Sequence, residues 1–386
     1  MSTEDPLRVG INARLLYEPK VRGWNRYTMN LLAELPAFGV RPVLYAEAAR
    51  PVHPVYLDRM PTDSYEVVLS PAMRYPVWLH RWLPRRCKLD RLDLLHSPFN
   101  FGLPWSSPCP RVLSLHDAID IVYYGKRGGW RDRLRPSAAS SRLDHWISRT
   151  RADRIIAVSE HARGDLVRAL GLPAGKVEVI PEAADPVFHQ PLTEADRERA
   201  RRRHDLPGRY VFYVGGWEGR KNIPFLVRAF AGAGVANLRL VLAGGADSQR
   251  ADLLGLANEL GIADRLTLLG WIEDEDLPAL YAEALCLAYP SEYEGFGLQL
   301  CEAMAVGCPC LAADATSLPE VLGAGGETFP LDSPGTLSVL IRKVAQDEPY
   351  RAELSRRARE RGQRFSWPIA AEQTADLYRR LLGRGP

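Results

Sequence analysis

Short apolar runs alternate with segments of helical periodicity along most of this 386-residue chain. Such alternation is typical of α/β proteins built on mostly parallel sheets. In the first half the pattern predicts a helix over Asn25–Leu35. The strands expected there are Leu7–Asn12, Arg111–Leu115, Arg154–Val158, which Ser159 follows as a helix cap, and Lys176–Ile180.

A second series of the same kind begins at Tyr210. Its strands are expected at Tyr210–Val214, Leu238–Ala243, Leu266–Leu269, Leu285–Ala288 and Cys308–Ala312, with helices near 224–234, 249–260, 276–283 and 298–306. Two successive α/β series predict two doubly wound domains facing a cleft. Ligands of such sheets bind at the carboxyl ends of strands, so sites are expected just after His116, Val214, Ala243, Leu269 and Tyr289.

The stretch Pro186–Pro207 is polar, highly charged and bracketed by prolines, so the domain boundary is expected there. The predicted division is a first domain over 1–190, a linker over 191–207, a second domain over 208–366 and a terminal helix within 367–386. The linker also carries an arginine run from Arg197 to Arg203. Acids that precede these arginines favour an exposed helix over a binding site.

Composition narrows the class of protein. The N-terminus is polar and unlike a signal peptide, and no apolar run approaches the roughly 18 residues of a membrane-spanning helix. Six cysteines form no Cys-x-x-Cys pair, which favours a reducing, cytoplasmic location, and Cys308 and Cys310 are expected in the core.

The net charge is only +3, but residues 1–150 are basic and the remainder is acidic, which suggests different partners for the two halves. No nucleic-acid motif accompanies the basic half, so no nucleic-acid partner is expected.

The most informative segment is Pro290–Leu298, between a predicted buried strand and a predicted helix. Gly295 and Gly297 let the backbone approach a ligand closely, and the helix start offers amides for phosphate. Glu294 lies in the loop and Glu302 follows eight residues later on the helix. Two carboxylates around Gly-Phe-Gly could bind sugar or ribose hydroxyls while the amides between them hold phosphate. The segment therefore predicts a nucleotide-sugar site.

This segment resembles the Glu-x7-Glu motif of glycosyltransferase family 4, whose members are retaining enzymes of GT-B fold. The resemblance implies that Glu294 contacts the transferred sugar and Glu302 the donor ribose, and that the terminal helix crosses back to the first domain. It also implies donor contacts from Gly295, Phe296, Gly297 and Leu298. Further resemblance runs through Arg8–Leu32, the Val-Ser-Glu-His run at 158–161, Ile180–Asp185, Val214–Ala229, Gly270–Ala284 and Ser317–Leu322.

The run Gly215–Asn222 follows the first strand of the second domain. Asn222 could cap the next helix, and Pro224 suits its first turn. Arg220 and Lys221 then project at the carboxyl end of the strand, where they could stabilise the charge of a departing nucleotide diphosphate. Lys221 matches the family lysine, whereas Gly216 stands where the family often has arginine. Because the run is not Gly-x-Gly-x-x-Gly, it does not favour a dinucleotide-dependent dehydrogenase.

Other donor contacts are weaker predictions. Gly244 ends a strand and permits close approach to the nucleotide. Gly215 and Gly216, after the first strand of the second domain, are also predicted donor contacts. The family resemblance implies that the backbone at Trp271 and Ile272 meets the base. It also places Glu320 beside the nucleotide, although a first-turn acid of a helix explains Glu320 equally well.

In the first domain, His116 and Asp117 end a predicted strand. The resemblance implies that His116 contacts the transferred sugar. The family has no established enzymatic nucleophile, so none is assigned here; the departing phosphate is thought to take the acceptor proton. The segment from Gly23 to Tyr27 resembles the family's Gly-x-Gly-Arg-Tyr turn on the acceptor side. Asn25 replaces the second glycine and tolerates a left-handed backbone better than most residues.

Two segments invite alternative interpretations. Asp274-Glu275-Asp276 has the Asp-x-Asp form that binds metal in the other main glycosyltransferase fold, but it precedes a predicted helix and is interpreted as its cap, so no metal is expected. Residues 74–91 hold six basic residues and one acid, interleaved with Trp78 and Trp82. This composition raises the hypothesis of peripheral contact with the inner face of a membrane.

Together these features predict a GT-B enzyme that transfers a hexose-type sugar, with retention, from a UDP- or GDP-sugar to a glycan or lipid-linked acceptor. His116, Lys221 and Glu294 are the predicted catalytic residues, and no cofactor is expected. Two alternatives stay open. One is a non-hydrolysing nucleotide-sugar epimerase, and the other is a catalytically silent nucleotide-sugar-binding protein.

Overall fold

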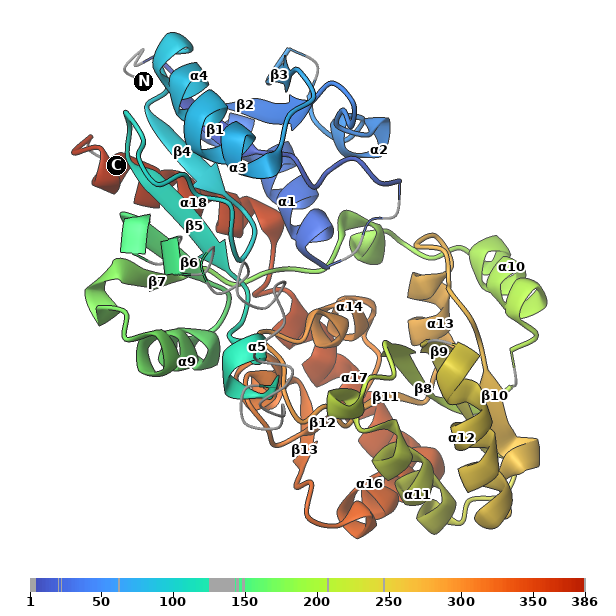
Figure 1. The fold of residues 1–386 in the computed structure, drawn as a ribbon. Coiled ribbons are helices and arrows are strands. Elements are labelled where there is room, and N and C mark those ends of the chain that lie inside the picture. The colour runs from blue at the N-terminus through green and yellow to red at the C-terminus, as the bar shows by residue number, and fades with distance from the viewer. Residues whose placement is uncertain are drawn as a thin grey trace. The chain divides into compact units, whose positions relative to one another are not determined.

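The computed structural model describes residues 5–19, 21, 23–61, 63–124, 143, 146–147, 150–206, 208–245 and 247–384. The chain divides into two compact units (Figure 1). The first contains residues up to Glu182 and returns from Ser366 onward, and the second is Ala183–Phe365. Each unit is built on one parallel sheet with helices between successive strands, so the predicted α/β class is confirmed.

The sheet of the first unit has the order β3-β2-β1-β4-β5-β6-β7. Its strands are β1 (Leu7–Asn12), β2 (Val40–Glu47), β3 (Glu66–Ser70), β4 (Leu94–Ser97), β5 (Arg111–Leu115), β6 (Arg154–Ala157) and β7 (Val177–Val179). The four strands predicted in this half are all present, whereas β2, β3 and β4 were not predicted. The order runs outward from β1 and β4 in both directions, as in doubly wound folds.

The helices of the first unit connect these strands. They are α1 (Gly23–Glu34), η1 (Leu35–Phe38), α2 (Pro54–Leu57), α3 (Tyr75–Val77), η2 (Trp78–Trp82), α4 (Leu83–Leu89), α5 (Ile119–Val122), α9 (Glu160–Leu170) and η3 (Ala174–Lys176). Ser159 caps α9 as predicted, because its hydroxyl accepts the Ala162 N–H at 2.9 Å.

The last helix, α18 (Trp367–Leu381), also belongs to the first unit. The Tyr378 hydroxyl lies 2.7 Å from His96 Nδ1, and His96 Nε2 lies 2.9 Å from the Ser114 hydroxyl. Burial lowers the pKa of His96 to about 3, so the ring is neutral and can accept one hydrogen bond and donate the other. This buried network joins α18 to β4 and β5.

The sheet of the second unit has the order β10-β9-β8-β11-β12-β13. Its strands are β8 (Tyr210–Gly215), β9 (Arg239–Gly244), β10 (Leu266–Leu268), β11 (Cys286–Tyr289), β12 (Cys310–Ala313) and β13 (Gly326–Phe329). The first five were predicted. Cys308 and Cys310 are buried as expected.

Helices also separate the strands of the second unit. They are η4 (Pro186–His189), α10 (Glu194–His204), η5 (Gly219–Lys221), α11 (Ile223–Ala233), α12 (Asp247–Glu259), η6 (Ala263–Arg265), α13 (Leu277–Glu283), α14 (Leu298–Val306), α15 (Leu318–Leu322), η7 (Gly323–Gly325), α16 (Pro334–Gln346) and α17 (Glu348–Gly362).

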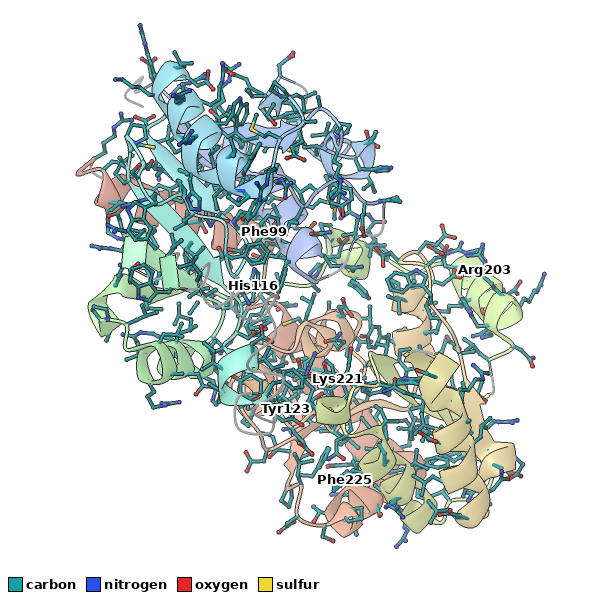
Figure 2. The ribbon with its side chains drawn as sticks, viewed as in Figure 1. Phe99, His116, Tyr123, Arg203, Lys221 and Phe225 are labelled. Carbon is teal, nitrogen blue, oxygen red and sulfur yellow. The ribbon has the colours of Figure 1, made fainter. Side chains whose placement is uncertain are left out.

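Most of the predicted linker is helix α10, which belongs to the second unit; Pro207, its last residue, lies outside the described residues. The division between the units falls earlier than predicted, between Glu182 and Ala183. Helix α10 is held against α13 and the turn before it by charge. Arg197 and Arg201 bind Glu283, whereas Arg199 and Arg203 (Figure 2) bind Asp276.

Asp276 begins α13, but its side chain makes no cap bond to the helix, contrary to prediction. Its carboxylate is fully buried and accepts hydrogen bonds from Arg199 and Arg203, and lies 2.9 Å from His204 Nε2. These partners hold the pKa of Asp276 below its usual value although burial raises it. Asp276, the last residue of the Asp-x-Asp triplet, therefore joins α10 to α13.

The aromatic part of the membrane hypothesis is wrong. Trp78 is fully buried, and Trp82 packs partly buried against it with ring centroids 5.8 Å apart. Basic side chains of the same segment, such as Arg81 and Arg85, are exposed. In the part of the chain that the structure describes, none of the helices has the length and apolar character needed to cross a membrane.

Candidate functional site

The two most informative loops of the sequence meet in the second unit. β8 and β11 are parallel neighbours in the sheet, so their carboxyl ends lie at the same edge. η5 follows β8 and the loop 290–297 follows β11. A backbone hydrogen bond from Glu292 N to Arg220 O, 2.7 Å long, joins the two loops. This pairing brings Arg220 and Lys221 to the loop that carries Glu294.

Lys221 and Arg220 converge on one carboxylate oxygen. Lys221 Nζ donates to Glu294 Oε1 at 2.6 Å, and Arg220 Nη1 donates to the same atom at 3.0 Å. Lys221 (Figure 2) is only 5% exposed, so this is a desolvated charge cluster. Charge-assisted bonds of this kind are stronger than neutral ones.

Burial and charge act in opposite directions on these groups. Burial raises the pKa of Glu294, but Lys221 and Arg220 outweigh it and hold the pKa below its usual value. Burial is also the largest influence on Lys221 and lowers its pKa, against the opposing attraction of Glu294. The cluster therefore holds an ionised carboxylate beside cationic groups at the edge of the sheet.

The loop before α14 is supported by the turn at Thr316 and Ser317. The Glu294 N–H donates to Thr316 Oγ1 at 3.1 Å, and the Ser317 hydroxyl is 2.8 Å from Phe296 O and 3.1 Å from Glu294 O. Gly297 precedes the helix with φ of 103°, a conformation that favours glycine. The first turn of α14 begins at Leu298, so its amides and the positive end of the helix dipole face this loop.

Glu302 has a separate setting on α14. It is buried, and one of its carboxylate oxygens accepts the Tyr281 hydroxyl at 2.8 Å. Tyr281 is fully buried on α13. The side chain of Glu302 is thus fixed by a neighbouring helix.

The glycines that end β8 and β9 allow these strand ends to approach closely. A Cβ at Gly244, whose φ is 87°, would lie 2.4 Å from Gly215 O. Gly244 N also donates to Gly270 O at 2.9 Å. Gly216 lies under the Glu218 carboxylate, 2.3 Å from where its Cβ would be, so an acid covers the position where the family often has arginine.

The remaining predicted donor residues have varied surroundings. Trp271 is 48% exposed just beyond β10, and Ile272 beside it is buried. Glu320 is exposed in the first turn of α15. Asn222 stands at the N-cap of α11 but makes no side-chain cap bond, contrary to prediction, since it adopts a left-handed backbone with φ of 53°.

In the first unit, His116, which is labelled in Figure 2, is held through both ring nitrogens. Its Nδ1 is 2.7 Å from Glu182 Oε1, and its Nε2 is 3.0 Å from Pro98 O. Both partners are acceptors, so both nitrogens must carry protons for both bonds to form. Burial lowers the pKa of His116, but the hydrogen bond and charge of Glu182 prevail and raise it. The ring is therefore favoured as an imidazolium.

The acceptor-side residues predicted from sequence lie on α1 and directly after His116. Gly23 begins α1, and the following Trp24 stacks on the His116 ring at 6.3 Å between centroids. The Asn25 amide donates to the Tyr56 hydroxyl at 3.0 Å. Asp117 precedes the N-cap residue of the short helix α5, and its Oδ1 accepts the Ile119 N–H at 3.1 Å.

Two residues of these clusters were missed from sequence. Glu182 lies just beyond β7, and Tyr289 is the last residue of β11, where its hydroxyl contacts Lys221 and Glu294. Their position at the carboxyl ends of predicted strands was the available signal.

Comparison with known families covers both units. Residues 21–188 match the family described as Glycosyltransferase Family 4, and residues 194–361 match Glycosyl transferases group 1. The second match contains Lys221, Glu294 and Glu302.

Individual relatives point to the same family. The D-inositol 3-phosphate glycosyltransferase of Corynebacterium aurimucosum is 30% identical over 92% of this chain and 90% of its own. The O-antigen chain mannosyltransferase B of Escherichia coli is 32% identical over 60% of this chain, and that match spans 61% of the relative's length.

The fold is shared with a crystal structure of Anabaena HepE in complex with UDP and glucose. Its TM-score is 0.72 at 17% identity, over 96% of this chain and 99% of that one. Two parallel-sheet units and this likeness confirm the predicted GT-B fold. With both halves matched and a near full-length relative, the chain belongs to the group 1 glycosyltransferases of family 4.

Proposed function

We propose that this chain transfers a hexose-type sugar from a UDP- or GDP-sugar to a glycan or lipid-linked acceptor, with retention of configuration. The observation that carries the proposal is the convergence of Lys221 and Arg220 on Glu294 beside the start of α14. A nucleotide-sugar donor carries a diphosphate and sugar hydroxyls, and this cluster offers cations and amides for the first and a carboxylate for the second.

The proposed reaction breaks the bond between the sugar C1 and the diphosphate oxygen, and it forms a bond from C1 to the acceptor oxygen on the same face. The acceptor proton passes to the departing phosphate. Negative charge grows on the diphosphate as it leaves, and Lys221, Arg220 and the α14 amides would stabilise it. Because protein cations supply this charge, we propose that no metal or cofactor is required.

The carboxylates take different roles in this proposal. Glu294 would bind hydroxyls of the transferred sugar, and Glu302 would bind the donor ribose. Lys221 and Arg220 bind Glu294 here, and an incoming diphosphate would compete for both cations. Donor binding would thereby release the Glu294 carboxylate toward the sugar.

His116 would contribute as a charged group on the acceptor-side unit. A general base must begin neutral, whereas Glu182 raises the pKa of this imidazole. We therefore propose that His116 contacts the transferred sugar without removing a proton from the acceptor. Gly23 and Asn25 at the start of α1, and Asp117 directly after His116, would border the acceptor.

Donor turnover across a panel of UDP- and GDP-sugars, with and without glycan and lipid-linked acceptors, tests the proposal. Nucleotide release that depends on an acceptor and yields a product of retained configuration supports it. Conversion of the donor without an acceptor would instead indicate an epimerase, and binding without turnover would indicate a silent binding protein. Unchanged rates with EDTA would support the metal-free scheme.

A further inference from the structure

Tyr289 places a phenolic hydroxyl at the centre of the charge cluster. It is the last residue of β11 and is fully buried. Its hydroxyl lies 2.9 Å from Lys221 Nζ, 3.1 Å from Glu294 Oε1 and 2.9 Å from Gln299 Oε1. One side chain thus touches the cation, the carboxylate and the first turn of α14.

Hydrogen-bond accounting favours one arrangement of this hydroxyl, in which its proton and both lone pairs have partners. A phenol has one proton to donate and two lone pairs to accept. The ammonium of Lys221 can only donate, and the ionised carboxylate of Glu294 can only accept, so the phenol proton goes to Glu294. The amide N–H of Gln299 then fills the second lone pair, since the oxygen and nitrogen of an amide can be exchanged by rotation. Every donor and acceptor around the hydroxyl is satisfied.

The ring that carries this hydroxyl is held in place. It stacks on Tyr213 with centroids 5.9 Å apart and planes 19° from parallel. The Tyr213 hydroxyl donates to Gly216 O at 2.7 Å. Burial raises the pKa of Tyr289 well above its usual value, so the phenol is neutral across the working range. A fixed, neutral hydroxyl can orient charges without competing with them.

We propose that Tyr289 is a positioning residue for the transfer reaction, whose hydroxyl aims the Lys221 ammonium and the Glu294 carboxylate at the donor. The inference rests on the proposed function of this cluster. When a diphosphate draws Lys221 away from Glu294, the phenol oxygen still holds the ammonium, and the phenol proton still satisfies the carboxylate. Tyr289 therefore keeps both groups in position through the exchange of partners.

The test compares Tyr289→Phe with Tyr210→Phe. Tyr210 is also buried, on the neighbouring strand β8, but its hydroxyl donates to Leu280 O at 2.7 Å and belongs to no part of the site. Loss of a charge-assisted hydrogen bond predicts that Tyr289→Phe lowers kcat by about ten- to a hundredfold, with a smaller change in donor KM. Tyr210→Phe should retain the wild-type kcat.

The pH dependence of kcat is a second measurement, and a purely structural role of Tyr289 would leave it unchanged. The phenol oxygen stabilises the charged form of Lys221, so its removal lowers the pKa of that amine further. The alkaline limb of kcat should therefore shift to lower pH in Tyr289→Phe and stay in place in Tyr210→Phe. Equal kcat and an unmoved alkaline limb in both variants would overturn the inference.

Two further measurements distinguish failure of the inference from misfolding of the variant and from failure of the proposed function. If Tyr289→Phe does not fold, Gln299→Leu removes the other anchor of the hydroxyl and should lower kcat in the same direction but less; an unchanged kcat there would overturn the inference. Wild-type protein that neither binds UDP or GDP nor releases either from any sugar donor would instead refute the proposed function, and the inference with it.

Discussion

At the scale of single residues, the site is governed by which charges share a buried partner. Lys221 and Arg220 share one oxygen of Glu294, and His116 shares its two nitrogens between Glu182 and a backbone carbonyl. Removal of one partner leaves the others buried and unsatisfied, which costs more than the bond itself contributes. Substitutions at these positions should therefore have large effects.

Lys221→Ala should lower kcat by about a hundred- to a thousandfold, because it removes a cation that faces the departing diphosphate. Lys343→Ala on α16, which removes an exposed lysine of the same unit, is the matched control and should keep full activity. Steady-state kinetics with the preferred donor measures both. Near-normal turnover in Lys221→Ala, Glu294→Ala and Glu302→Ala alike would show that the site is elsewhere.

Glu182→Gln should destabilise the protein in a pH-dependent way. Glu182 raises the pKa of His116, so its contribution to stability is fully present below the unfolded imidazole pKa of about 6.5 and is lost as the pH rises through the folded value. The difference in Tm between wild type and Glu182→Gln should therefore be largest near pH 6 and shrink by pH 9.

Glu178→Gln is the control, since Glu178 lies on the edge strand β7, a few residues before Glu182, and pairs at the surface with Arg380. Its Tm difference should be small at every pH. A Tm difference between wild type and Glu182→Gln that stays constant or widens as the pH rises would contradict the assignment of His116 as an imidazolium.

At the scale of elements, charge holds helices that apolar packing alone would leave loose. Helix α10 buries only Ala200, yet two of its arginines bind Glu283 and two bind Asp276. Removal of a buried carboxylate that serves several cations leaves those cations without their partner, which costs more than removal of an exposed pair.

Asp276→Ala should lower the free energy of unfolding by roughly 1–3 kcal/mol, below the range for a fully buried pair because its arginine partners are partly exposed. Glu275→Ala, which removes an exposed acid bound to Arg203, should cost less than about 1 kcal/mol. Urea denaturation measures both. Equal losses in the two variants would count against the structural role of Asp276.

Membrane contact remains a proposal for the exposed face of α4 and of the turn before it. Arg81, Arg85 and Lys88 are exposed there, and Leu89 is 70% exposed. Arg81→Glu combined with Arg85→Glu should weaken binding to vesicles that contain anionic lipid, by about 1 kcal/mol for each basic residue lost. Flotation with neutral and anionic vesicles measures it.

The control for this charge reversal is Arg202→Glu with Arg228→Glu, which changes two exposed arginines of the second unit. It should leave flotation unchanged. Wild-type protein that does not float with anionic vesicles at low salt would refute membrane contact.

At the scale of the whole molecule, two units of similar construction carry different chemistry. The second unit gathers Lys221, Arg220 and Glu294, whereas the first gathers His116, Glu182 and Trp24. Both clusters stand at the carboxyl edges of their sheets, because parallel strands present their loops and helix starts there. This division fits a donor site in one unit and acceptor contacts in the other.

A nucleotide diphosphate should stabilise the protein by mass action, by about 2.7 kcal/mol at a hundred times its Kd. UDP, GDP and ADP compared in a thermal-shift assay should give one preferred base, and hydrogen exchange should show protection at 215–221 and 290–302. The shift should be largely lost in Lys221→Ala. No shift with any of the three nucleotides would contradict a donor site in the second unit.

The sequence by itself determined what local pattern can encode. Strand β1 and the five strands from β8 to β12 follow from short apolar runs, and the order of Gly-Phe-Gly, Glu294 and Glu302 predicted a strand, a loop and a helix start. The α/β class follows from the alternation of strands and helices, and parallel-sheet geometry places ligand sites at the strand ends just after Val214 and Tyr289.

Only the tertiary structure decided which side chains share a buried space. Strands β2, β3, β4 and β13 were missed because their pairing depends on neighbours far away in the sequence. Trp78 turned into the core, and Asp276 became a bridge between helices rather than a cap. Tyr289 and Glu182 joined the two charge clusters. Burial and hydrogen-bond partners come from segments brought together by folding, and a linear pattern does not record them.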